Sequence, residues 1–333
     1  MAIDVHAHYL PGPVLERLGA EGARLGVEIL GTEPACRLRF AHGLELRPFF
    51  PKLVEEPARR LAGMDGMGID RQILSGWTDM FAYGLDAGRG AAWHRLLNEE
   101  LGAFCQRHPD RFSWLASGHL ADPAAAAREL DRAVRHLGAV GGVAATHVEG
   151  TNLGELPLDE YWAAATGLDV PVLLHPMQPV ATPRTARFAL NQIVHYPFDT
   201  TLGVGSLLAT GVLDRFPRLG LVLAHGGGAL PYLLGRFDVM HGRVDHAVTG
   251  IVAVTPPTAY VRRLYYDTLL HAPHALRYLA SLVGVDRLVI GTDDSFPPAD
   301  HDPLGSLRAA GFSPEEIRRI GEGTPRRLFR LPD

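Results

Sequence analysis

Residues 3–8 read Ile-Asp-Val-His-Ala-His, the first of eight short apolar runs that decide the fold. The other runs span residues 72–77, 113–119, 142–148, 172–175, 221–225, 264–268 and 288–292. They are rich in branched residues, as expected of strands buried on both faces. Longer amphipathic segments separate them, for example at 91–106, 123–136, 158–167 and 274–283. Repeated alternation of strand and helix predicts an α/β fold, a closed (β/α)8 TIM barrel, with an open doubly wound sheet as the alternative.

One stretch, residues 11–57, does not follow the alternation. It is rich in Pro and Gly and contains short mixed patterns such as Arg37-Leu-Arg-Phe-Ala-His42. A loop of this length in a compact domain usually has a function. We therefore predict an insertion after the first strand that lies over the barrel mouth. A second excursion, 182–201, follows the fifth strand, and without a linker the 333 residues are expected to form a single domain.

The composition is that of an ordinary soluble globular protein, with 47% hydrophobic and 21% charged residues. The net charge of −5 argues against nucleic-acid binding. No apolar run is long enough to cross a membrane, and no cationic stretch suggests a secretory signal. The two cysteines, Cys36 and Cys105, are far apart and are expected to be thiols, which fits a cytoplasmic location.

His6 and His8 close the first predicted strand. Residues two apart on a strand point to the same side, so both imidazoles should face the barrel axis. The C-terminal strand ends of such a barrel open on one face, where active sites are built. Two neutral imidazoles at this spacing suit a metal such as zinc. A hydrogen-bonded structural pair is the alternative.

Other ionisable residues end later strands and should meet this pair at the same face. His175 closes the fifth run, and Asp293 follows the eighth. Burying either group without a partner is costly, so we predict one divalent cation at this place. Its expected ligands are His6, His8, His175 and Asp293. His225, which ends the sixth run before three glycines, is assigned to acid/base catalysis, with a role as fifth ligand as the alternative.

Several motifs carry a family resemblance when they are read in order. They are Ile3-Asp-Val-His-Ala-His8, His175-Pro176, Ala224-His-Gly-Gly-Gly-Ala229, Tyr266-Asp-Thr-Leu-Leu-His271 and Gly291-Thr-Asp293. This set resembles the aminocarboxymuconate semialdehyde decarboxylase-like branch of the amidohydrolase superfamily, from residue 3 to about residue 329. The resemblance implies a (β/α)8 barrel that holds one zinc or manganese ion, the same four ligands, and acid/base catalysis by His225.

The resemblance also implies a homodimer and substrate-binding arginines. Arg236 matches an arginine that in the family reaches the neighbouring protomer's active site and binds a substrate carboxylate. Arg47, in the insertion, falls near the family's other carboxylate-binding arginine in a loosely matching stretch, and an exposed loop arginine is the alternative. Position near the predicted mouth, rather than the resemblance, adds four substrate-binding candidates. His147 and His271 contact substrate or, alternatively, orient a metal ligand. Trp77 and Phe296 form a wall of the pocket or, alternatively, belong to the core.

Lys52 is the only lysine of the chain and lies in the insertion. Many barrel hydrolases of this superfamily hold two metals bridged by a carboxylated lysine on the fourth strand, and the fourth predicted strand here has no lysine. This favours a one-metal site. The chain also departs from the semialdehyde decarboxylases on the substrate side, at Met177-Gln178 and at Asp294-Ser295-Phe296. These departures leave the substrate open, and Asp294 is expected to point away from the metal.

These parts predict an enzyme that acts on a small carboxylate. The first hypothesis is a metal-dependent, non-oxidative decarboxylase of an unsaturated or aromatic carboxylic acid, in which arginine orients the carboxylate and His225 handles the proton. The alternative is a mononuclear hydrolase of a C–C, ester or lactone bond, in which a metal-activated water attacks a carbonyl. A non-catalytic metal-binding protein is disfavoured, because an open site with a free acid/base histidine has no structural purpose.

Overall fold

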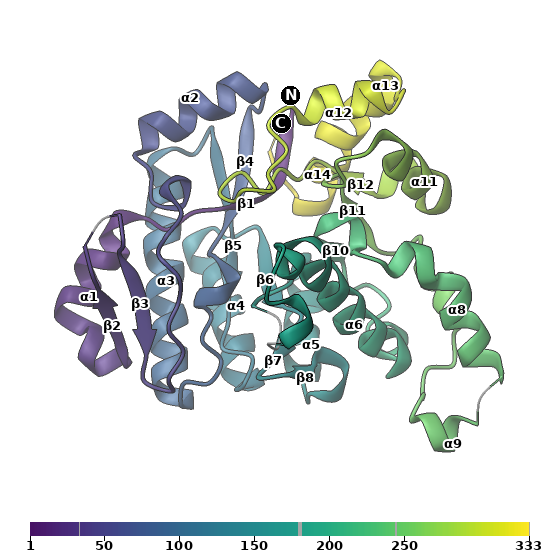
Figure 1. Cartoon of the computed structure of the whole chain (residues 1–333), viewed down its shortest axis with the longest axis horizontal. Helices are drawn as coiled ribbons and strands as arrows, with labels where there is room; N and C mark the ends of the chain where they lie inside the picture. Colours follow the sequence, from purple (N-terminus) through teal and green to yellow (C-terminus); the bar gives the residue numbers. More distant parts are fainter. Residues whose placement is uncertain (33, 179–181, 244, 333) are drawn as a thin grey trace.

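The computed structural model describes residues 1–32, 34–178, 182–243 and 245–332. Its centre is an eight-stranded parallel sheet (Figure 1). In spatial order the strands are β1 (Ile3–His8), β4 (Arg71–Ser75), β5 (Phe112–Ser117), β6 (Gly141–Ala145), β9 (Val172–His175), β10 (Leu221–Leu223), β11 (Tyr265–Asp267) and β12 (Leu288–Val289). A parallel bridge between Asp4 and Ile290 brings the last strand back to the first. The predicted (β/α)8 barrel is confirmed, and the open-sheet alternative is wrong.

Helices connect the strands on the outside of the barrel. The main ones are α2 (Pro57–Met67), α3 (Ala87–Arg107), α4 (Pro123–Leu137), α5 (Asp159–Leu168), α6 (Tyr196–Ala209) and α11 (Pro273–Val283). Helix α4 begins and ends where its sequence predicts. The Asp122 side chain accepts a hydrogen bond from Ala125 N at 3.0 Å, Pro123 opens the helix, and Gly138 ends it with a φ of 80°.

The insertion after β1 is a folded unit rather than a long loop. It consists of α1 (Gly12–Leu25), the antiparallel pair β2 (Val27–Leu30) and β3 (Arg37–Phe40), and the short helix η1 (Pro51–Leu53). Its apolar residues, among them Val14, Leu18, Leu38 and Phe40, form a cluster with Trp93 of α3 that is separate from the barrel core. Figure 1 places α1 and the hairpin beside helix α3, at the flank of the barrel. The prediction that the insertion covers the mouth holds only for its last part, which includes Arg47.

Two further features lie in the second half of the chain. Helix α8 (Leu230–Arg243) and the short helix α9 (His246–Thr249) project away from the barrel (Figure 1). The excursion after β9 contains short helices at Pro183–Thr185 and Asn191–His195 that lead into α6. Within the described ranges, no helix combines the length and the apolar character needed to cross a lipid bilayer.

Candidate metal centre and its cavity

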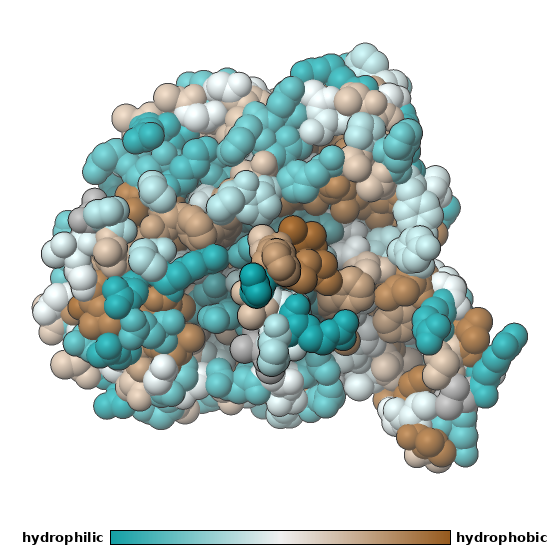
Figure 2. Space-filling model, viewed as in Figure 1, coloured by the Kyte–Doolittle hydropathy of each residue, from teal (hydrophilic) through white to brown (hydrophobic). Residues whose placement is uncertain are grey.

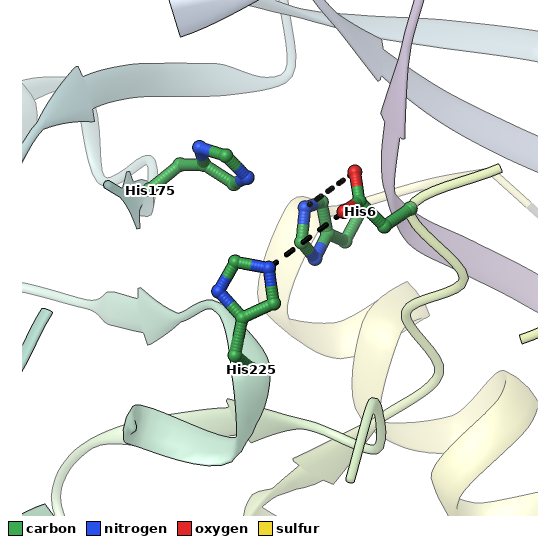
Figure 3. A group of neighbouring side chains, drawn as sticks. His6, His175 and His225 are labelled. Carbon is green, nitrogen blue, oxygen red and sulfur yellow. Dashed lines mark ion pairs between the residues drawn. The ribbon is translucent and has the colours of Figure 1, made fainter. Parts of the chain in front are cut away.

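The histidines predicted from the strand ends come together at one place. The rings of His6, His175 and His225 converge from three different strand ends (Figure 3). Their ring centroids lie 4.8–5.2 Å apart, and that of His8 lies 4.7 Å from that of His175. Ligand atoms of His6, His175, His225 and Asp293 all lie within 4.8 Å of one another.

Hydrogen bonds fix which nitrogen of each ring faces the centre. Nδ1 of His6 lies 2.6 Å from Oδ2 of Asp267, Nδ1 of His8 lies 3.1 Å from Gly76 O, and Nδ1 of His175 lies 2.6 Å from Pro176 O. Carbonyl and carboxylate oxygens only accept, so Nδ1 donates in each case and carries the proton. In its neutral form each of the three rings therefore presents an Nε2 lone pair to the centre, which is the form that binds metals.

Four buried polar atoms at the centre have no hydrogen-bond partner in the part of the chain that the structure describes. They are the Nε2 atoms of His6, His8 and His175 and Oδ1 of Asp293. Leaving such groups unsatisfied in the interior is costly. Oδ1 of Asp293 lies 3.4 Å from Nε2 of His6 and 3.3 Å from Nε2 of His8. Three imidazoles and one carboxylate fit an open divalent-metal site, so the residues present suit the cation that the family resemblance implies.

The charges of the site favour a bound cation. Burial by itself lowers the pKa of His6, but the Asp293 and Asp267 carboxylates outweigh burial and raise the pKa to about 10. Burial lowers the pKa of His8 and holds that of His175 well below its ordinary value, so these rings are neutral at neutral pH. Burial opposes ionisation of Asp293, yet the neighbouring histidines hold its pKa well below the usual range. The site therefore favours one positive charge, which is a proton on His6 when no cation is present and which a bound cation would replace.

His225 stands at the edge of this group. Its Nε2 lies 3.7 Å from Oδ2 of Asp293, and its backbone N donates to Oδ2 of Asp267 at 2.9 Å. The following glycines are required by packing. A Cβ on Gly226 would lie 2.5 Å from Leu270 Cδ2, and one on Gly228 would lie 1.9 Å from the backbone oxygen of Pro197. The glycines thus allow the tight turn that holds the imidazole at the cavity floor.

A cavity of ≈ 360 Å³ opens above the centre, and most of the predicted substrate-binding residues line it. From the predicted set these are Arg47, Trp77, His271 and Phe296, together with His175, His225 and Asp293. Trp77 and Phe296 form an aromatic wall, with ring centroids 5.9 Å apart. The Arg47 guanidinium lies 4.4 Å from the ring centroid of Phe50 and 5.4 Å from that of Trp77, which holds a positive charge at the mouth.

Two predicted substrate-binding residues lie elsewhere. His147 is on the short strand β7 (His147–Val148), and its Nδ1 accepts a hydrogen bond from Gly150 N at 3.1 Å, so it is fixed to its own turn and does not line the cavity. Arg236 lies on α8 and lines a separate apolar pocket with Phe237 and Met240. Its predicted role concerns a neighbouring protomer and stays a prediction.

Sequence reasoning missed several supporting residues. Asp267 holds His6, and Thr78 Oγ1 lies 3.0 Å from Nδ1 of His175. Tyr196 lines the cavity and donates from its hydroxyl to Oδ2 of Asp79 at 3.3 Å. Asp267 carried one signal, a carboxylate at the end of an apolar strand. Nothing local in the sequence marks the other three.

The fold and the site together define an amidohydrolase. The sequence pattern that defines the family described as Amidohydrolase matches residues 3–331, and the chain belongs to this family. The predicted membership is confirmed.

Among its relatives, the 2-amino-3-carboxymuconate-6-semialdehyde decarboxylase of Dictyostelium discoideum is 28% identical over 99% of this chain and 89% of its own length. A gamma-resorcylate decarboxylase of Rhizobium radiobacter is 30% identical over 84% of this chain and 89% of its own length.

Solved structures have the same fold. The 5-carboxyvanillate decarboxylase of Sphingomonas paucimobilis superposes with a TM-score of 0.82 at 24% identity and covers 99% of both chains. A dihydroxybenzoic acid decarboxylase of Polaromonas, which was crystallised with manganese and the inhibitor 2-nitroresorcinol, superposes with a TM-score of 0.78 at 23% identity, over 99% of this chain and 97% of its own. At these identities the likeness concerns the fold alone.

Proposed function

We propose that this chain is a metal-dependent, non-oxidative decarboxylase of an aromatic or unsaturated carboxylic acid. The observation that carries the proposal is the convergence of four buried candidate ligand atoms without hydrogen-bond partners among the described residues. They lie on the floor of a cavity that has aromatic walls and an arginine at its mouth. The 2-amino-3-carboxymuconate-6-semialdehyde and gamma-resorcylate decarboxylases among its relatives support the same reaction.

One divalent cation per chain, zinc or alternatively manganese, is held in this proposal by His6, His8, His175 and Asp293. When bound, the cation supplies Lewis-acid stabilisation of negative charge on a substrate oxygen. The Polaromonas decarboxylase was crystallised with manganese, which supports manganese as the alternative to zinc.

The chain's own residues position the substrate and move the proton. Trp77 and Phe296 flank a planar ring, and Arg47 pairs with the carboxylate. The bond between the ring carbon and the carboxyl carbon breaks, carbon dioxide leaves, and the electron pair on the ring carbon takes up a proton. His225, whose Nε2 faces the Asp293 carboxylate, delivers that proton, and Asp293 orients the imidazole.

Arg236 completes the site of a second copy in our proposal. Helix α8 and its neighbour α9 expose large apolar side chains, among them Tyr232, Val239, Met240 and Val248. Figure 2 shows brown, hydrophobic residues beside hydrophilic ones on the projecting part of the molecule. An exposed patch of this kind favours association with another protein surface, here a homodimer. Mixing the inactive variants Arg236→Ala and His225→Ala should restore activity in the mixed dimers if Arg236 acts across the interface; no recovery would contradict it.

The central experiment compares products. Carbon dioxide release from 2,6-dihydroxybenzoate and related phenolic acids should depend on added zinc or manganese, whereas esters of the same acids should not be hydrolysed. The variant His225→Ala should lose turnover and keep about one metal per chain. Ester hydrolysis without decarboxylation would refute the proposal in favour of a hydrolase, and loss of metal in His225→Ala would make His225 a ligand.

A further inference from the structure

The only lysine of the chain forms an ion pair beside the candidate metal centre. Lys52 Nζ lies 2.6 Å from Oδ1 of Asp294, whose side chain is 1% exposed, whereas the side chain of Lys52 is 42% exposed. Asp294 directly follows Asp293. A buried carboxylate requires a cation or strong donors. Among the described residues Lys52 makes the closest ion pair with Asp294, since His301 Nδ1 lies 3.6 Å from the same oxygen.

The backbone on the lysine side is anchored. Lys52 O accepts a hydrogen bond from Nη1 of the buried Arg60 at 3.3 Å. The next carbonyl, Leu53 O, accepts one from Leu10 N at 2.8 Å, just beyond the strand that carries the first two histidines. The ammonium is therefore presented from a fixed segment rather than from a free loop.

The loop on the aspartate side is connected to the metal centre at several points. Asp293 N donates to His6 O at 2.8 Å, and Ser295 Oγ donates to His8 O. The Phe296 ring lies 5.2 Å from that of His8. A shift of this loop would therefore displace the Asp293 carboxylate and disturb both histidines.

Aromatic contacts join the two segments a second time. The ring of Phe50, two residues before Lys52, lies 5.1 Å from that of Phe296. The same Phe50 ring supports the guanidinium of Arg47 at 4.4 Å. One short segment thus carries both the arginine of the cavity mouth and the lysine paired with the metal loop.

We propose that Lys52 is a positioning residue that holds the end of the insertion on the metal-ligand loop. The inference rests on the proposed function, in which Asp293 is a ligand and Arg47 binds the substrate carboxylate. Without the ammonium, Asp294 is a buried carboxylate that lacks its nearest cation, and the loop must move to hydrate it. That movement carries Asp293 away from its place and releases the Arg47 segment.

The test compares Lys52→Met with its parent in metal affinity and in steady-state kinetics. Partners that orient metal ligands typically change affinity or activity by roughly 10- to 100-fold when they are removed, and we expect a loss of zinc and manganese affinity in that range. With saturating metal, KM should rise more than kcat falls, because Arg47 binds substrate in the ground state. Lys52→Arg should recover part of both.

A double-mutant cycle isolates the pair. Asp294→Asn should weaken metal binding as Lys52→Met does, and the combined variant should be no worse than the poorer single variant, because both substitutions remove one interaction. The matched control is Arg215→Met, which breaks the outer ion pair with Asp159, at 2.9 Å, and should leave affinity and kinetics unchanged.

A chemical readout separates this inference from the proposed function. Because Lys52 is the only lysine, reductive methylation with labelled formaldehyde marks one side chain besides the N-terminus. Its labelling should be slow in the parent and faster in Asp294→Asn. Parent-like metal affinity and labelling in these variants would overturn the positioning role. If Asp293→Asn itself binds metal as the parent does, the metal assignment fails instead.

Discussion

Asp267 holds several parts of the candidate site in place through hydrogen bonds, and the variant Asp267→Asn tests this role. The carboxylate is buried on β11. Its Oδ2 accepts from Nδ1 of His6 at 2.6 Å and from His225 N at 2.9 Å, and its Oδ1 accepts from Gly226 N at 2.7 Å and from Leu269 N at 3.2 Å. It therefore orients one candidate ligand and fixes the backbone of the candidate acid/base residue.

The expected loss of stability follows from the number of hydrogen-bond donors that the Asp267 carboxylate accepts from. Asparagine keeps one acceptor oxygen and replaces the other by an NH2 group that faces N–H donors. In either orientation two donors lose their acceptor. Hydrogen bonds to a charged group contribute about 1.5–3 kcal/mol each, so the free energy of unfolding should fall by about 3–6 kcal/mol. The loosened His6 ring should weaken metal binding by roughly 10- to 100-fold.

Urea unfolding with and without metal measures the first quantity, and competition with a chelating dye measures the second. Asp159→Asn, which removes an exposed carboxylate far from the site, is the control and should change neither. If Asp267→Asn unfolds at the parent's urea midpoint and binds metal equally well, the claim that Asp267 anchors His6 and the His225 turn is refuted.

Three further predictions concern the cavity, its wall and the metal. Gly228→Ala should lower Tm and abolish activity, because a Cβ there would lie 1.9 Å from Pro197 O at a φ of 62°; a parent-like melting curve would contradict this. Burial raises the pKa of Asp79 to about 6, above its unfolded value of 3.8, so the contribution of this one carboxyl group to the parent's stability should fall by about 3 kcal/mol as pH rises from below 4 to above 6. Urea midpoints of Asp79→Asn should lack this component of the pH dependence. A chelator should lower Tm, and added zinc or manganese at a hundredfold excess over Kd should restore about 2.7 kcal/mol of stability.

The barrel could be predicted because its signal is repeated. Each buried parallel strand is a short apolar run, and its right-hand connection through a helix leaves a second, longer pattern after it. The secondary structure of the insertion was harder to predict from the sequence. Its two short strands are not marked by a long apolar run, and its helix α1 begins at Gly12 directly after a proline. Its separate cluster against α3 forms only from residues far apart in the sequence.

In the candidate metal centre, the residues that could be predicted are those that lie at the ends of predicted strands. A residue that closes a barrel strand must lie at the C-terminal face, whatever its neighbours are. The partners of those residues follow no such rule. Lys52 and Asp294 are 242 positions apart, and Thr78 reaches His175 from a turn after another strand. His147 also closes a predicted run, but the chain turns there into a small antiparallel pair with Thr151–Asn152, and this keeps its ring out of the cavity.

The orientation of the three rings depends on the closed barrel as a whole. His6 is held by Asp267 from β11, His8 by Gly76 after β4, and His175 by Pro176 next to it and by Thr78. The groups that hold the three rings thus come from several segments that are far apart in the sequence. An unfolded or partly closed chain therefore cannot present the three Nε2 lone pairs together, and the free energy of metal binding becomes free energy of folding. The same dependence explains why a His-x-His pair alone does not distinguish a metal site from a structural pair. The two differ in whether oxygen atoms accept hydrogen bonds from Nδ1 and so leave Nε2 free, and only the complete fold supplies those oxygens.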